Sequence, residues 1–269
     1  MHPILVQYNA LVIGTHDAFA LIGSLLALWL SWRLALRARR ADSDLLLIMG
    51  MGVLAGALFG RFGLFLRYAQ DAPAPTLDGF LQFGGRTLLG GLTGAYLGVL
   101  LTKRIIGYRR HTGDLLAPGV ALGIAVGRIG CFLTERPGTP TTLPWGITVS
   151  REASAGWIGC VGCERGVPMH PSFLYESAFL FVLGWWLLRA ATRGRLPAPW
   201  MVEGDLFKLF LFAYATFRFG VEFVRGNPAM ALGLSGSQLM VLPASAALAW
   251  YFVTRRRAAR SSFTTAIVT

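Results

Sequence analysis

The sequence predicts an all-α membrane protein with seven transmembrane helices, and three observations carry this prediction. Of the 269 residues, 54% are hydrophobic and only 14% are charged, whereas a soluble domain carries about a quarter charged residues. Seven apolar runs approach the roughly 20 residues that a helix needs to cross a hydrocarbon core. Clusters of Arg and Lys follow every second run, which is the pattern of the positive-inside rule.

The runs also predict how the chain is threaded through the membrane. In chain order they cover about 18–36, 45–68, 80–101, 115–134, 173–188, 206–224 and 238–253. Basic clusters come after the first, third, fifth and seventh runs. We therefore expect an outside N-terminus, a cytoplasmic C-terminus and a single transmembrane domain over 1–269, with an extracytoplasmic segment at about 135–170.

The formal net charge of +12 raises the question of a nucleic acid partner. The basic residues fall in short clusters between apolar runs and do not line one polar face. This distribution is typical of a membrane protein, so we expect no nucleic acid to bind.

Four apolar runs contain an arginine inside the run or near its outer end: Arg61, Arg86, Arg128 and Arg218. Insertion scales put the cost of arginine at a helix centre at about 2.5–3.5 kcal/mol. Such a cost is tolerated where the guanidinium has a partner in a wet or polar interior. The alternative is snorkelling to the outer interface, with pairing to carboxylates or carbonyls, and Arg61 and Arg67 fit it best.

The other arginines predict an anion site in the outer half of the membrane. Arg218 and Glu222 are four residues apart, so they share a helix face and can pair. Arg225 extends that face by about one turn, and Arg86 lies among glycines that would let a ligand come near. Each planar guanidinium can bind two phosphate oxygens, which suits an anionic phospholipid headgroup or a soluble anion.

Several motifs, in order along the chain, resemble those of the prolipoprotein diacylglyceryl transferases. GRIGCFLTERPGTPTTLPWG resembles the signature segment of that family, and MHPSFLYES resembles its His-Pro-Ser-x-Leu-Tyr-Glu segment. FRFGVEFVRGNP resembles its Phe-Arg-Phe-x-x-Glu-Phe-x-Arg segment, and LGLSGSQLMVLP the start of its last span. GGRTLLGG stands where the family has a glycine-flanked histidine motif. The resemblance also implies the seven-span topology with the N-terminus outside.

The resemblance implies an activity: transfer of the diacylglyceryl group of phosphatidylglycerol to the cysteine thiol of a lipoprotein precursor, with release of glycerol phosphate. Arg128 and Arg218 match the arginines that would hold the phosphate, and Glu222 matches the glutamate that would orient the second of them. Further matches fall on Glu135, Gly138, His170, Tyr175 and Glu176. The implied location is the outer leaflet of the bacterial inner membrane.

The sequence departs from the family pattern at three positions. Leu89 stands at the family's histidine, Cys131 at its signature asparagine, and His16, followed by Asp17, at the tyrosine of the first span. A thiol of pKa about 8.5 needs about 2 kcal/mol to ionise at pH 7, and nearby arginines can supply part of this. His16 is therefore a candidate substitute base, and the alternative is an interfacial histidine without a role.

The cysteines leave several interpretations open. Cys160 and Cys163 form a CVGC pair that could be a short disulfide, two free thiols or, with His170, part of a metal site that lacks a fourth ligand. Cys131 is interpreted as a small apolar filler, with a covalent nucleophile as the alternative. We expect no metal site and no cofactor.

These observations favour a phospholipid-dependent transferase, with a non-catalytic lipid-binding or lipid-moving protein of the same fold as the alternative. An anion transporter fits less well, because the inner halves of the runs are apolar apart from Lys208. The predicted catalytic residues are Arg128, Arg218, Glu222, Glu135 and His16. The predicted phosphate-binding residues are Arg128, Arg218, Arg86, Arg225, Gly138 and His170. The expected partners are phosphatidylglycerol and a lipoprotein precursor or another thiol acceptor.

Overall fold

The computed structural model describes residues 4–8, 11–68, 87–135, 137–148, 166–194 and 196–268. In this part of the chain there are seven α-helices, one for each predicted apolar run: α1 (Thr15–Arg37), α2 (Ser43–Tyr68), α4 (Leu88–Ile105), α5 (Gly113–Thr134), α7 (Ser172–Arg193), α8 (Asp205–Val221) and α9 (Gly236–Val268). By length and composition, α1, α2, α5, α7 and α9 can cross a membrane. The all-α, multi-pass prediction is thus confirmed, whereas the span count and orientation stay predictions.

Several helix boundaries differ from those predicted. The third run was expected to begin near residue 80, but α4 begins at Leu88 after an extended Thr87, and 80–86 lie outside the described residues. The sixth run was expected to reach residue 224, but α8 gives way to the 3-10 turn η1 (Glu222–Val224). α9 continues well past residue 253 because basic residues end an apolar run without ending a helix.

Two short antiparallel hairpins were not predicted. β1 (Ile4–Tyr8) pairs with β2 (Leu11–Gly14) before α1, and β3 (Ala229–Ala231) pairs with β4 (Leu234–Ser235) before α9. Leu232 and Gly233 both have positive φ angles, 54° and 71°, as a two-residue hairpin turn requires.

The chain forms two compact units, residues 1–34 with 111–269, and residues 35–110. The prediction of a single transmembrane domain concerns how the chain crosses the membrane, and these units do not test it. In the second unit, α2 packs against α4 through glycines. A Cβ at Gly94 would lie 2.6 Å from the Ala55 carbonyl oxygen. The glycines of the third run therefore serve close helix packing, as expected.

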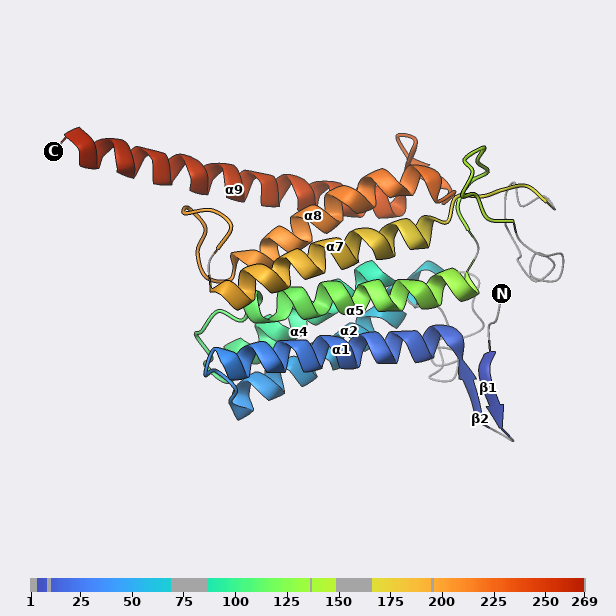
Figure 1. The fold of residues 1–269 in the computed structure, drawn as a ribbon, viewed down its shortest axis with the longest axis horizontal. Helices are drawn as coiled ribbons and strands as arrows, with labels where there is room; N and C mark the ends of the chain where they lie inside the picture. The colour runs from blue at the N-terminus through green and yellow to red at the C-terminus, as the bar shows by residue number, and fades with distance from the viewer. Residues whose placement is uncertain are drawn as a thin grey trace. The chain divides into compact units, whose positions relative to one another are not determined.

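In the first unit, α5, α7, α8 and α9 lie side by side and alternate in direction (Figure 1). The end of α5, the start of α7, the end of α8 and the start of α9 consequently meet at one end of the unit. Backbone hydrogen bonds join them there: Gly138 N–H donates to the His170 carbonyl at 2.7 Å, and Thr139 N–H to the Val224 carbonyl at 2.8 Å.

Residue sizes in this unit are those of a protein surrounded by lipid. Ala117, Ala121 and Ala125 of α5 are fully buried, whereas Trp185 of α7 and Trp250 of α9 are exposed. Small interior residues allow close helix contacts, and large apolar side chains outside suit a hydrocarbon solvent. This agrees with a multi-pass membrane protein.

At the opposite end of the unit, polar side chains fix the start of α8. The Asp114 carboxylate accepts the backbone N–H groups of Gly204 at 2.8 Å and Leu206 at 3.0 Å. Lys208 pairs with the fully buried Asp205 at 2.7 Å and donates to the Tyr251 hydroxyl at 2.8 Å. Lys208, the main polar exception in the apolar inner halves of the predicted runs, is therefore part of a local structural cluster.

Candidate active site at one end of the helices

Four charged side chains from separate segments come together where α5, α7 and α8 meet. Arg128 lies in the last two turns of α5, Glu176 in the second turn of α7, and Arg218 in the last turn of α8. Arg225 follows η1. Arg128, Glu176 and Arg218 are buried, and the side chain of Arg225 is only 14% exposed.

Glu176 is the centre of this cluster. Its carboxylate is fully buried and forms a 2.8 Å ion pair with Nη2 of Arg128 and a 3.2 Å ion pair with Nη1 of Arg225. The Tyr214 hydroxyl donates to the same carboxylate in a short hydrogen bond. One side chain of α7 thus holds α5, α8 and the segment after η1 in a defined arrangement.

Arg218 and Glu222 form the ion pair that their spacing predicted, with Nη1 donating to Oε2. The other oxygen of Glu222 accepts hydrogen bonds from Asn227 Nδ2 at 2.6 Å and Ser235 Oγ at 2.7 Å. Since Ser235 belongs to β4, Glu222 ties the β3–β4 hairpin to the end of α8. Arg218 is therefore held by a carboxylate that is itself fully hydrogen-bonded.

Arg225 connects the cluster with the outer edge of the site. Its guanidinium lies 4.3 Å from the centre of the Phe173 ring, and its Nη2 lies 4.0 Å from Glu135. Burial, followed by the positive charges of Arg128 and Arg218, lowers the pKa of Arg225 to about 10. The mutual influence of the three guanidiniums indicates one shared positive region.

Among the described buried groups of this region, the positive and negative charges do not balance. Three guanidiniums face two buried carboxylates, Glu176 and Glu222, while Glu135 is 42% exposed. The Nε of Arg128 is buried and has no hydrogen-bond partner among the described residues. An unpaired buried N–H costs about 1–3 kcal/mol. Excess positive charge and an unused donor are properties of an anion-binding site.

The remaining predicted residues lie around this cluster. His16, in the first turn of α1, has its Nε2 3.8 Å from Glu135. A Cβ at Gly138 would lie 1.9 Å from the Val224 carbonyl oxygen, so the loop approaches the end of η1 where only glycine fits. His170 contacts Tyr175 through Nδ1 at 3.2 Å. Gly138 and His170 therefore shape the loop beside the guanidiniums.

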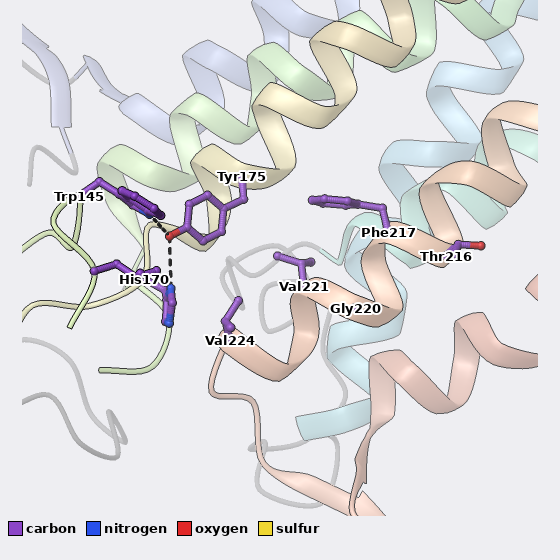
Figure 2. A pocket seen from close by; sticks show the side chains of 9 residues that line it. Trp145, His170, Tyr175, Thr216, Phe217, Gly220, Val221 and Val224 are labelled. Atoms are coloured by element: carbon purple, nitrogen blue, oxygen red, sulfur yellow. Dashed lines mark hydrogen bonds between the residues drawn. The ribbon is translucent and has the colours of Figure 1, made fainter. Parts of the chain in front are cut away.

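A cavity of about 570 Å³ opens between the site ends of α7 and α8. Figure 2 shows Tyr175 pointing toward Trp145 and His170, while Phe217 lies on the α8 side. The Tyr175 hydroxyl accepts a hydrogen bond from Trp145 Nε1 at 2.8 Å. Most other lining side chains are apolar, among them Leu143, Phe217, Val221 and Val224. The cavity is therefore suited to an apolar group.

Several residues singled out in the sequence are not at this site or are not described. Arg86, Cys160 and Cys163 lie outside the described residues, and Leu89 lies on α4 in the other unit. Conversely, Tyr214, Asn227 and Ser235 belong to the site but were not predicted from the sequence. The spacing of Tyr214, four residues before Arg218 on one helix face, was a usable signal, whereas the contacts of Ser235 depend on the hairpin.

Fold and site together define a multi-pass α-helical membrane protein with a buried arginine–carboxylate cluster at one end of its helices. Residues 3–254 match the protein-family model described as prolipoprotein diacylglyceryl transferase. The chain belongs to that family.

Relatives match over nearly the whole chain. The phosphatidylglycerol–prolipoprotein diacylglyceryl transferase of Azotobacter vinelandii is 34% identical, with 96% of this chain and 96% of the relative covered. The enzyme of the same name from Vibrio atlanticus is 32% identical, and the match covers 90% of this chain and 86% of the relative. That from Methylobacillus flagellatus is 30% identical, with 95% and 97% covered.

Proposed function

We propose that this chain transfers the diacylglyceryl group of phosphatidylglycerol to the cysteine thiol of a lipoprotein precursor. The observation that carries this proposal is the convergence of Arg128, Arg218 and Arg225 around buried carboxylates with positive charge in excess. Family membership and the names of the relatives support the same reaction.

The three arginines would bind the phosphodiester of the lipid headgroup. A phosphate oxygen would give the unused Nε of Arg128 the hydrogen-bond partner that no described residue provides. Its negative charge would also offset the excess positive charge. Charge-assisted hydrogen bonds from guanidinium to phosphate are about twice as strong as neutral ones. Gly138 and His170 are proposed to complete the phosphate side of the site, while Arg86 stays a prediction from the sequence because it lies outside the described residues.

The reaction exchanges one bond for another at a glyceryl carbon. The substrate sulfur forms an S–C bond, the C–O bond to the phosphate breaks, and its electron pair leaves with glycerol phosphate. Arginines already fixed by Glu176 and Glu222 would stabilise the charge that develops on the leaving phosphate without reorganising. Glu135 is proposed to position Arg225, its neighbour at 4.0 Å.

The thiol must lose its proton, and Leu89 cannot accept one. The corner where His16 meets Glu135 is the proposed place of proton removal, with His16 as the first candidate acceptor. Its ring is about one-third exposed, so an incoming thiol could reach it.

The cavity beside α7 and α8 is proposed to hold part of an acyl chain. Its lining is mostly apolar, and each buried CH₂ group contributes about 0.8 kcal/mol to binding. The predicted topology places this end of the helices at the outer leaflet of the bacterial inner membrane.

The test is to incubate the purified protein with labelled phosphatidylglycerol and a lipobox peptide. A transferase adds the diacylglyceryl mass to the peptide and releases glycerol phosphate. Arg128→Lys and Arg218→Lys should each lose most of this activity, because lysine cannot make the bidentate contact of a guanidinium with phosphate. Arg189→Lys is the matched control, since Arg189 stacks on the exposed Trp185 further along α7.

The same experiment separates the alternative, a lipid-binding or lipid-moving protein without catalysis. That alternative is favoured by Leu89 at the family's histidine position. It predicts that labelled phosphatidylglycerol is retained in an arginine-dependent way while the peptide mass stays unchanged. Full activity in both lysine variants would contradict the proposed role of the arginines.

A further inference from the structure

Three side chains with different metal-binding atoms meet beside the arginine cluster. They are His16 of α1, and Cys131 and Glu135 at the end of α5. One nitrogen, one sulfur and one carboxylate oxygen from these residues all lie within 4.8 Å of one another. His16 and Cys131 are also two of the positions at which the sequence departs from the family motifs.

Local structure brings this trio together. Cys131 and Glu135 are four residues apart, so they lie one turn apart on the same face of α5. α1 reaches that face because α5 has glycine at the crossing: a Cβ at Gly130 would lie 2.6 Å from the Cβ of Phe19 and 3.5 Å from the Cα of His16. The proximity of His16 and Cys131 therefore results from helix packing.

Each of the three side chains has a charged neighbour. Asp17 lies 3.9 Å from His16 Nδ1, leaving Nε2 directed to Glu135. Arg128 Nη1 donates to the Cys131 sulfur at 3.6 Å, and Arg225 lies 4.0 Å from Glu135. A carboxylate behind a histidine, as Asp17 lies behind His16, raises the affinity of that ligand for a metal.

We propose that His16, Cys131 and Glu135 bind a divalent transition-metal ion, with zinc the best match, and leave its fourth position open. Zinc accepts this mixture of nitrogen, sulfur and oxygen ligands, and three protein ligands with an open position are typical of its catalytic sites. Tetrahedral zinc ligands lie about 3.3–3.5 Å apart, so distances of up to 4.8 Å within the trio need to contract by about 1.5 Å at most. No metal site was predicted from the sequence, in which the CVGC pair with His170 lacks a fourth ligand.

This inference rests on the proposed function for its purpose. The open position would take the thiol of the lipoprotein precursor, because a metal-bound thiol is deprotonated outright. The proton passes to water, the thiolate sulfur forms the S–C bond, and the phosphate leaves as before toward the arginines. His16 then acts as a ligand instead of a base, and the missing histidine at Leu89 is no longer needed.

Cobalt binding tests the site without depending on activity. The Cys160→Ser/Cys163→Ser protein, freed of metal, is titrated with Co²⁺ in detergent micelles, so that Cys131 is its remaining cysteine. We expect one equivalent to bind, with a cobalt–thiolate charge-transfer band. Cys131→Ala should remove the band, His16→Ala should weaken binding, and Asp17→Asn should weaken it roughly 10- to 100-fold.

His111→Asn serves as the matched control, because His111 lies before the start of α5 and the trio lies at its end. This variant should bind cobalt as before. No band in the starting protein, or an equal band after Cys131→Ala, would overturn the site. Transfer is then measured in metal-free protein and after zinc is restored. Equal rates would overturn the role of the metal in activating the thiol. Cobalt binding by a protein that transfers no lipid would instead leave the metal site standing and contradict the proposed function.

Discussion

At the scale of single residues, the site depends on Glu176 more than its place in the sequence suggested. It is a fully buried carboxylate that pairs with Arg128 and Arg225 and also accepts the Tyr214 hydroxyl. Buried ion pairs are not strong sources of stability in themselves, but removing one partner leaves an uncompensated buried charge. Glu176 therefore allows the arginines to be buried together, and the arginines make the region positive.

Replacing Glu176 with glutamine should weaken both the fold and the site. The amide can still accept a hydrogen bond, but it no longer neutralises Arg128 and Arg225. We expect a loss of about 3–5 kcal/mol in stability, seen as a lower Tm in detergent, together with strongly reduced lipid transfer. Glu203→Gln, at an exposed carboxylate, should change neither, and an unaltered Tm for Glu176→Gln would contradict the central role of Glu176.

Gly138 allows a sharper test because its surroundings leave no room for a methyl group. A Cβ there would lie 1.9 Å from the Val224 carbonyl oxygen. Gly138→Ala should push the loop away from η1 and cost about 1–3 kcal/mol, the usual cost of overpacking. Gly127→Ala on α5 is the control, since a Cβ at Gly127 meets no atom within 4 Å. Gly138→Ala should show a lower Tm and less lipid transfer than Gly127→Ala.

At the scale of helices and turns, local sequence patterns predicted the features that depend on one segment alone, namely the helices and an ion pair within one of them. Apolar runs located the seven helices of the described residues, and the four-residue spacing predicted the Arg218–Glu222 pair. The contacts that complete the site, such as Ser235 with Glu222, join segments that meet only after the β3–β4 hairpin forms. No periodicity marks such a contact. The trio of His16, Cys131 and Glu135 was missed because it depends on how α1 crosses α5.

The packing of α2 against α4 permits a prediction about glycine at this scale. Gly94→Ala would place its Cβ 2.6 Å from the Ala55 carbonyl oxygen and 2.3 Å from the Cβ of Phe59, so the helices must separate. Gly50→Ala on α2 meets nothing within 4 Å and should be neutral or stabilise by up to about 1 kcal/mol, because alanine favours helix. A lower Tm is expected for Gly94→Ala and an unchanged or higher Tm for Gly50→Ala, and equal shifts would contradict the close glycine contact.

At the scale of the whole molecule, the charge distribution predicts the membrane orientation on which the proposed function depends. Basic clusters follow alternate apolar runs, and in the first unit the arginine cluster lies at the helix ends opposite to Lys208 and Asp205. If the basic clusters are cytoplasmic, the arginine cluster faces the outer leaflet. A secreted lipoprotein precursor would meet its lipid donor on that side.

Labelling of single cysteines tests this orientation directly. In the Cys160→Ser/Cys163→Ser background, with Cys131 buried, Thr142→Cys places an exposed thiol on the loop after α5, and Ala259→Cys places one after the last basic cluster. In intact spheroplasts, a membrane-impermeant maleimide should label the first variant and should reach the second only after lysis. Because both sites are exposed, a difference in labelling reports the side of the membrane. The reverse pattern would put the arginine cluster at the cytoplasmic leaflet and remove the basis for transfer to a secreted thiol.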